Sequence, residues 1–212
     1  MTMLRTLAAA AGLALLAGCE VPEENSASPA EVSQAAYQHA GPPALTLYTV
    51  INNYSGAGAH SALMVNADQR AIYDPAGTFY HPHLPEVGDV HYGMSPPAVD
   101  FYIDYHARES FRVIEQTIPV TPRQAAIAMA EIQRYGAAPK AHCTVSVASI
   151  LSRVPGFEDT PSTWFPKKLM EAVSDRPGVM VREVRDDSKD DNSGLLQAPA
   201  LLHQRQKTQS PT

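Results

Sequence analysis

Three residues of this chain have side chains suited to thiol chemistry: Cys143, His60 and Asp74. Cys143 is followed at helical spacing by apolar residues: Val147, Ile150, Leu151 and Val154. This spacing predicts a helix that begins at Cys143 and packs against a core. A thiol at a helix N-terminus has a lowered pKa, because the positive end of the helix dipole stabilises the thiolate. The free N–H groups there can also bind an oxyanion. The position of Cys143 is equally consistent with a small buried thiol that only fills space in the core.

His60 and Asp74 are expected to lie close together on neighbouring strands. His60 opens a strand over 60–65 after a Gly-rich loop, and a turn over 66–69 leads to a second strand over 70–74. The hairpin returns Asp74 to the vicinity of His60. A thiol, a histidine base and an orienting acid form a nucleophilic catalytic group. A strand histidine alone is more often structural, but its combination with Cys143 favours catalysis.

The elements around these residues predict an α+β domain, a small antiparallel sheet packed against helices. Further strands are expected at 45–51, 99–105, 110–118 and 178–184. Helices are expected to begin at Thr121, near His142 and at Thr163. Thr121, Pro122 and Gln124 form a capping-box pattern. The segment 78–97, rich in His, Pro and Gly, is expected to be a long surface loop.

The first residues have the pattern of a secretory signal peptide, 1–18. One positive charge, Arg5, precedes a short apolar run over 7–17 that ends in small residues. The sequence Leu16-Ala17-Gly18-Cys19 resembles the bacterial lipobox, in which the signal is cut before the cysteine. The resemblance implies that Cys19 becomes acylated. The chain is therefore expected to be exported to the bacterial cell envelope and tethered to a membrane, because two or more acyl chains anchor stably.

Composition predicts one folded domain over 43–184, preceded by a flexible tether over 19–42 and followed by a disordered polar tail over 185–212. The net charge is −6 and no basic stripe is present, so nucleic-acid binding is not expected. The chain has 2 cysteines. If Cys19 is acylated, Cys143 has no disulfide partner, and a lone thiol in an oxidising compartment favours a reactive role.

Two short motifs resemble a known superfamily. Gly58-Ala59-His60-Ser61-Ala62-Leu63-Met64-Val65 is followed far downstream by His142-Cys143-Thr144-Val145-Ser146-Val147. This order resembles the circularly permuted branch of the NlpC/P60 papain-like superfamily, an order shared with lecithin–retinol acyltransferase-like enzymes. The resemblance covers roughly 45–154. It implies a permuted papain-like fold with Cys143 as nucleophile, His60 as base and Asp74 as third polar residue.

Some positions in this resemblance have alternatives. Glu86 or Asp89, in the following loop, could replace Asp74 as the third residue. The family often has an asparagine before the nucleophile, where this chain has His142, which could compete as a base.

The sequence therefore predicts a membrane-anchored cysteine hydrolase or acyltransferase without a cofactor or metal. An amidase or peptidase and an acyl ester or thioester hydrolase remain open, with a peptide, a peptidoglycan peptide, a lipidated protein or an acyl lipid as substrate. The alternatives are a non-catalytic envelope lipoprotein that uses the fold for binding or assembly, and a metal-binding lipoprotein using His81, His83 and His91. The oligomeric state is left open.

Overall fold

The computed structural model describes residues 26–192. The predicted signal peptide, Cys19 and residues 193–212 of the predicted tail lie outside the described residues. Within them, an antiparallel sheet of 7 strands has the order β4-β5-β3-β2-β1-β6-β7. The strands are β1 (Ala44–Asn52), β2 (Gly58–Asn66), β3 (Arg70–Tyr73), β4 (Glu86–Val87), β5 (Val90–Tyr92), β6 (Phe111–Pro119) and β7 (Met180–Arg185). The predicted α+β class is confirmed.

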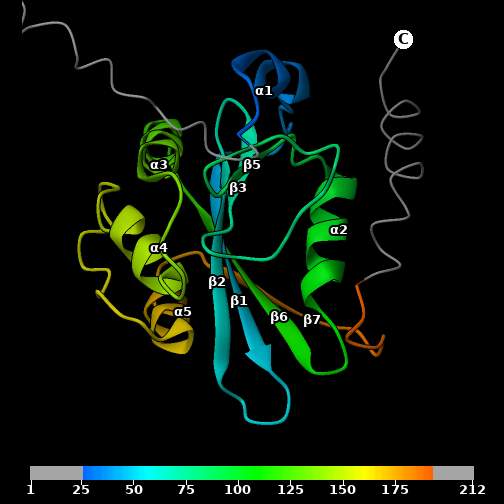
Figure 1. Cartoon of the computed structure of the whole chain (residues 1–212). Coiled ribbons are helices and arrows are strands. Elements are labelled where there is room, and N and C mark those ends of the chain that lie inside the picture. The colour runs from blue at the N-terminus through cyan, green and yellow to red at the C-terminus, as the bar shows by residue number, and fades with distance from the viewer. Residues whose placement is uncertain (1–25, 193–212) are drawn as a thin grey trace, which may run out of the picture.

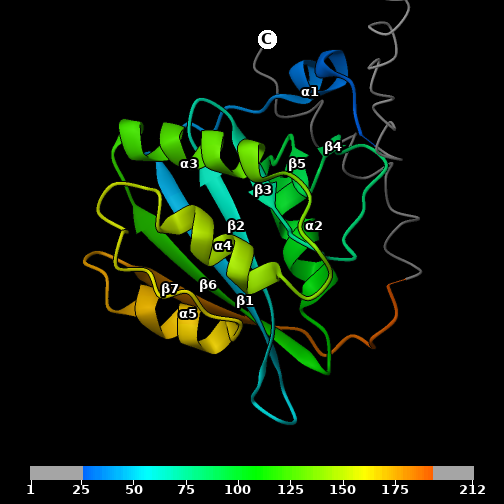
Figure 2. The same ribbon diagram turned by 60° about the vertical axis from the view of Figure 1, so that its left-hand side comes forward.

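Helices cover both faces of this sheet, as Figures 1 and 2 show. The helices are α1 (Pro29–Ala35), α2 (Pro96–His106), α3 (Pro122–Tyr135), α4 (Cys143–Leu151) and α5 (Pro166–Ser174). Helices α3, α4 and α5 lie on one face, and α2 lies on the other (Figure 1). None of the helices among residues 26–192 is long and apolar enough to cross a membrane.

The two faces of the sheet bury separate apolar clusters because side chains alternate along each strand. On β2, Leu63 and Val65 pack towards α3, α4 and α5, whereas Ala62 and Met64 pack towards α2. The long central strands are thus buried on both sides. By the same alternation, His60 belongs to the α2 face of the sheet.

The segment 96–106 is a helix, so the strand predicted over 99–105 is wrong. Its apolar residues fit both periods: Val99, Phe101 and Ile103 alternate, while Ala98, Phe101 and Tyr102 have helical spacing. Ser95 at the N-cap and proline in the first turn favour the helix, because the fixed φ of proline suits that position. Burial of the helix on the sheet then selects the 3.6-residue period.

The segment 78–97 is not a surface loop throughout. It contains β4 and β5 and the start of α2, and it buries His81 and His91 to 2% exposure each. Pairing of β5 with β3 accounts for the burial of His91, because it carries the returning chain onto the sheet. His81 packs edge-on against Phe101 of α2, with ring centroids 4.9 Å apart.

The ends of the described chain contact the domain. Helix α1 lies within the predicted tether and has a Ser28–Glu31 capping box, and the N–H of Ala27 donates to the carbonyl of Glu86 at 2.7 Å. After β7, the N–H of Glu109 donates to the carbonyl of Ser188 at 2.9 Å. Hydrogen bonds therefore hold parts of both predicted flexible segments against the sheet and its connections.

Candidate functional site

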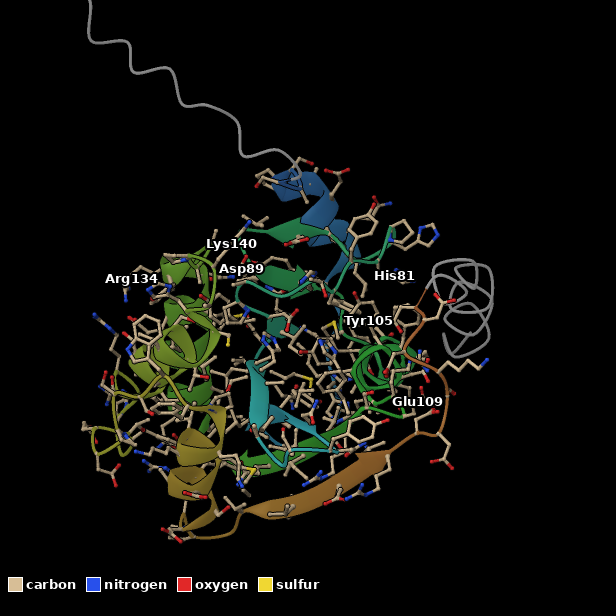
Figure 3. The ribbon with its side chains drawn as sticks, turned by 60° about the horizontal axis from the view of Figure 1, so that its bottom comes forward. His81, Asp89, Tyr105, Glu109, Arg134 and Lys140 are labelled. Carbon is tan, nitrogen blue, oxygen red and sulfur yellow. The ribbon has the colours of Figure 1, made fainter. Side chains whose placement is uncertain are left out.

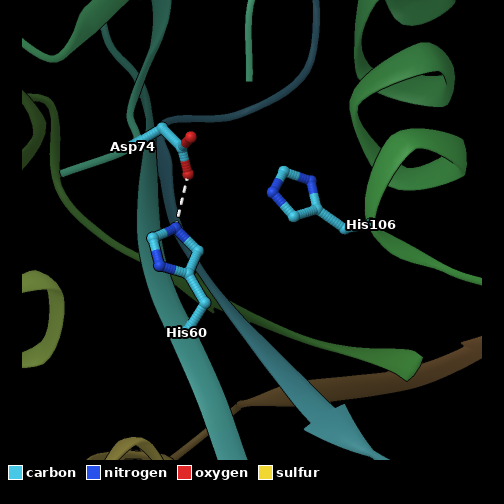
Figure 4. Close-up of side chains that lie close together, drawn as sticks. All are labelled: His60, Asp74 and His106. Atoms are coloured by element: carbon cyan, nitrogen blue, oxygen red, sulfur yellow. Dashed lines mark hydrogen bonds and ion pairs between the residues drawn. The ribbon is translucent and has the colours of Figure 1, made fainter. Parts of the chain in front are cut away.

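His60 and Asp74 meet where β2 runs past the end of β3. The β2–β3 ladder ends at the pair Leu63–Tyr73, and Asp74 is the next residue of the chain. On an antiparallel pair, this position and His60 are diagonal neighbours on one face, within reach of long side chains. The Nε2 atom of His60 lies 2.6 Å from Oδ1 of Asp74 (Figure 4). The side chains are 15% and 1% exposed, respectively, so little water competes with this contact.

The Oδ1 atom of Asp74 has a second hydrogen-bond partner besides His60. The hydroxyl of Tyr102 on α2 donates to Oδ1 of Asp74 at 2.7 Å. A Cβ atom on Gly77 would lie 2.0 Å from Oδ2 of Asp74, so only glycine allows the chain to pass this close. The carboxylate therefore has a fixed position from which it orients His60.

Cys143 lies at the first position of α4, as the sequence predicts. The hydroxyls of Ser61 on β2 and Thr144 on α4 lie 3.1 Å apart and are buried, which ties the start of the helix to the strand that bears His60. Cys143 is a free, partly buried thiol, and its Sγ atom lies 3.8 Å from Oγ1 of Thr144. The imidazole of His60 and the backbone of Ser61 both lower the pKa of this thiol. Because Nε2 of His60 is occupied by Asp74, Nδ1 is the ring nitrogen left for Cys143.

The charges of these groups support one another. Burial opposes the charged form of Cys143, but the hydrogen bond and positive charge of His60 lower the pKa of Cys143 to about 7. Burial also opposes the charged form of His60, yet Asp74 and Cys143 raise the pKa of His60 to about 10. The pKa of Asp74 lies well below its usual range, because the charge of His60 outweighs burial. Between about pH 7 and pH 10 the arrangement is thus a thiolate–imidazolium pair supported by a carboxylate.

His106, at the end of α2, lies beside this group (Figure 4). Its ring is parallel to that of His60, with an interplanar angle of 3° and centroids 5.8 Å apart. Its Nδ1 donates to the carbonyl of Tyr102 at 2.9 Å, since a carbonyl only accepts. Burial, with a smaller contribution from the charge of His60, holds the pKa of His106 below its usual value, which favours the neutral ring.

The donor atoms of His60, Asp74 and His106 lie within 4.8 Å of one another, which makes these described residues a candidate group of metal ligands. However, two ligands of one tetrahedral zinc ion, each about 2.0–2.1 Å from the metal, lie about 3.3 Å apart. The 2.6 Å contact between His60 and Asp74 is a hydrogen-bond distance. The donor geometry fits a shared proton better than a metal ion.

A pocket of about 320 Å³ opens beside His60 and His106. Cys143 does not line it. The lining residues come from β1, β2, the 76–78 turn, α2, the connection from α2 to β6, β6 and the segment after β7: Val50, Ala59, His60, Ala76, Gly77, Thr78, Tyr105, His106, Arg108, Phe111, Asp190 and Asn192. The pocket therefore reaches the imidazole of His60 but not the thiol of Cys143.

The residues considered as alternatives to Asp74 lie elsewhere. Asp89 accepts hydrogen bonds from the N–H groups of Ala76 and Ala138 at 2.9 and 2.8 Å, so it ties two loops together. Figure 3 shows it on the side where Lys140 lies. Glu86 lies 3.8 Å from His91, and burial with the charges of Asp89 and Asp74 raises the pKa of Glu86 to about 7. Neither carboxylate has a described hydrogen bond to His60.

The three histidines considered for a metal site do not form one group. His81 and His83 have ring centroids 5.6 Å apart, whereas His91 packs edge-on against Phe79. Figure 3 shows His81 on the side of α2. The other alternative base, His142, precedes α4 and packs its ring on Trp164, with centroids 4.6 Å apart.

Tyr102, His106 and Arg108 are site residues to which the sequence assigned no specific role, although Tyr102 is one of several tyrosines that could line a groove. All three lie in or directly after α2, the segment predicted as a strand. Tyr102 and His106 are four residues apart, the spacing that places two side chains together on a helix. This spacing is the signal that could have indicated them.

Comparison with known proteins identifies no relative. The chain matches no protein-family model, and no curated protein and no solved structure shows significant similarity to it. Its function is therefore inferred from the site itself.

Proposed function

We propose that this chain is a cysteine hydrolase or acyltransferase that acts through Cys143, with His60 as base and Asp74 as the residue that orients it. One observation carries the proposal: His60, which lowers the pKa of Cys143, bonds a buried carboxylate through its Nε2 atom. This order of thiol, imidazole and acid is what nucleophilic catalysis by cysteine requires.

The reaction runs in two steps. The Cys143 thiolate attacks the carbonyl carbon of an amide or ester, and the N–H groups of the first turn of α4 bind the oxyanion. His60 then donates its proton to the leaving nitrogen or oxygen, whose bond to carbon breaks, and an acyl-thioester remains on Cys143. Water or another acceptor, deprotonated by His60, attacks this thioester and releases the thiolate.

The setting proposed for this chemistry is the bacterial envelope. The lipobox-like residues before Cys19 support export and lipid anchoring, and the order of His60 before Cys143 supports a permuted papain-like architecture. Amide and ester substrates both suit the mechanism. The competing proposal is a non-catalytic lipoprotein that keeps the fold for binding, which the partly buried state of Cys143 favours.

The first test is the rate of iodoacetamide alkylation of Cys143 against pH, in the full-length chain carrying C19S. We expect a midpoint near pH 7. In H60A the pKa of Cys143 returns towards 9, so the thiolate fraction at pH 6.5 falls about 100-fold. The more basic thiolate of H60A is about 10-fold more nucleophilic, so the alkylation rate at this pH should fall by about 10-fold in total.

The second test uses p-nitrophenyl acetate and intact-mass spectrometry. An acetyl adduct is expected on Cys143 and not in C143S. Alkylation no faster than that of an ordinary thiol, together with no acetyl adduct, would favour the binding lipoprotein.

A further inference from the structure

Two exposed aromatic side chains lie next to the start of α4. Trp164 and Phe165 are 57% and 62% exposed. Such exposure is unusual, because contact between large aromatic rings and water is unfavourable. The ring of Trp164 packs on that of His142, the residue before Cys143. Trp164 and Phe165 thus form an apolar surface one residue away from the proposed nucleophile.

The backbone under these two side chains is firmly held. Thr163 and Pro166, on either side of them, are buried, and the N–H of Phe165 donates to the Thr163 hydroxyl at 3.1 Å. A Cβ atom on Gly58 of β2 would lie 2.6 Å from Cβ of Pro166, so the start of α5 packs tightly against the strand of His60. The aromatic rings are therefore presented outwards by a fixed support.

Three exposed lysines belong to the segments that carry Phe165 and His142. Lys167 and Lys168 follow it on the exposed side of α5, and Nζ of Lys168 lies 5.4 Å from the ring centroid of Phe165. Lys140 is exposed, and its carbonyl accepts a hydrogen bond from His142 at 3.0 Å. Among residues 26–192, none of these lysines has an ion-pair partner within salt-bridge distance. Their positive charge is available to an anionic partner.

We propose that Trp164, Phe165 and the three lysines form a docking surface for an anionic lipid bilayer. Tryptophan and phenylalanine enter the boundary between headgroups and acyl chains, while lysine side chains reach the lipid phosphates. Each lysine near an anionic surface strengthens binding about fivefold. The surface brings the start of α4 to the membrane. This inference rests on the proposed function. In this orientation Cys143 would act on a substrate whose amide or ester bond lies at the bilayer surface.

Trp164 reports on this surface directly, because it is the single tryptophan of the chain. The experiment uses the full-length chain with C19S and C143S, so that neither acylation of Cys19 nor the reactive thiol contributes. It is mixed with vesicles of phosphatidylcholine alone or with phosphatidylglycerol. Vesicles containing phosphatidylglycerol should shift Trp164 emission to shorter wavelength, and brominated acyl chains should quench it.

Matched variants identify the surface by co-sedimentation with the same vesicles. The double variant W164A/F165A should bind at least about 10-fold more weakly, and K167Q/K168Q should lose most of the preference for phosphatidylglycerol. Y80S is the control, because Tyr80 is also an exposed aromatic residue, at 54%, but lies in the loop before β4. Unchanged Trp164 emission, or equal losses in Y80S and W164A/F165A, would overturn the proposal.

A last measurement separates this inference from the proposed catalysis. In the C19S chain, phosphatidylglycerol vesicles should slow alkylation of Cys143 severalfold, and W164A/F165A should abolish this protection. Vesicle binding without rapid alkylation would support the docking surface and reject the thiol enzyme. Rapid alkylation without vesicle binding would do the opposite.

Discussion

His60 Nε2 lies 2.6 Å from Oδ1 of Asp74 although their strands no longer pair at that point. The contact depends on the diagonal relation between the two positions and on the hydrogen bond that Oδ1 of Asp74 accepts from Tyr102. A buried carboxylate held in this way has two consequences. It keeps His60 protonated well above the usual pH range of histidine, and through His60 it stabilises the thiolate of Cys143.

Replacing Asp74 should therefore change the pKa of Cys143, although Asp74 acts on this thiol only through His60. In D74N the imidazolium of His60 loses its anionic partner, so the pKa of His60 falls and the pKa of Cys143 rises from about 7. The midpoint of alkylation against pH should shift upwards, while the rate at pH 10 stays close to that of the parent chain. An unchanged midpoint would show that Asp74 does not act through His60. D89N, which alters a loop contact, is the control.

Loss of the Tyr102 hydroxyl should destabilise the fold. This buried group donates to a charged carboxylate, and such hydrogen bonds contribute about 1.5–3 kcal/mol. Y102F should lower the free energy of unfolding by about that amount at pH 7, measured by urea denaturation with an unchanged m-value. Y105F removes a hydroxyl that donates to the carbonyl of Thr78 at a more exposed position, and it should cost clearly less. Equal losses would contradict a special contribution from Asp74.

The contributions of the Ser61 and Thr144 hydroxyls to the free energy of unfolding should be strongly coupled. Each is buried, and removing one leaves the other without its 3.1 Å partner. S61A and T144V should each cost about 1–3 kcal/mol of unfolding free energy, whereas the double variant should cost less than their sum. The measurement is a double-mutant cycle by urea denaturation. Additive effects would mean that the two hydroxyls do not bond in the native state.

Acylation of Cys19 is testable without reference to the folded domain. Cells expressing the parent chain and supplied with labelled palmitate should yield a labelled protein in the membrane fraction. C19S should remain unlabelled, and C143S should be labelled like the parent. Label that depends on Cys143 instead would locate a transient acyl group on the proposed nucleophile and argue against the lipobox.

Features that depend on near neighbours along the chain could be predicted from the sequence. Thr121 and Gln124 form the predicted capping box at the start of α3, because both partners lie within one turn. Cys143 opens α4 as its apolar spacing indicates. The proximity of His60 and Asp74 could also be inferred, because a short hairpin leaves few ways for its strands to pair.

Contacts between distant segments depend on how the whole chain packs. The apolar pattern of 96–106 fits a strand and a helix equally, and packing on the sheet made it α2. This choice brought Tyr102 to Asp74 and His106 to His60. Likewise, no local pattern places Trp164 on His142 or Asn192 on Arg108. Such contacts join residues far apart in sequence, and they form because helices bury their apolar faces against a completed sheet, which is a property of the whole fold.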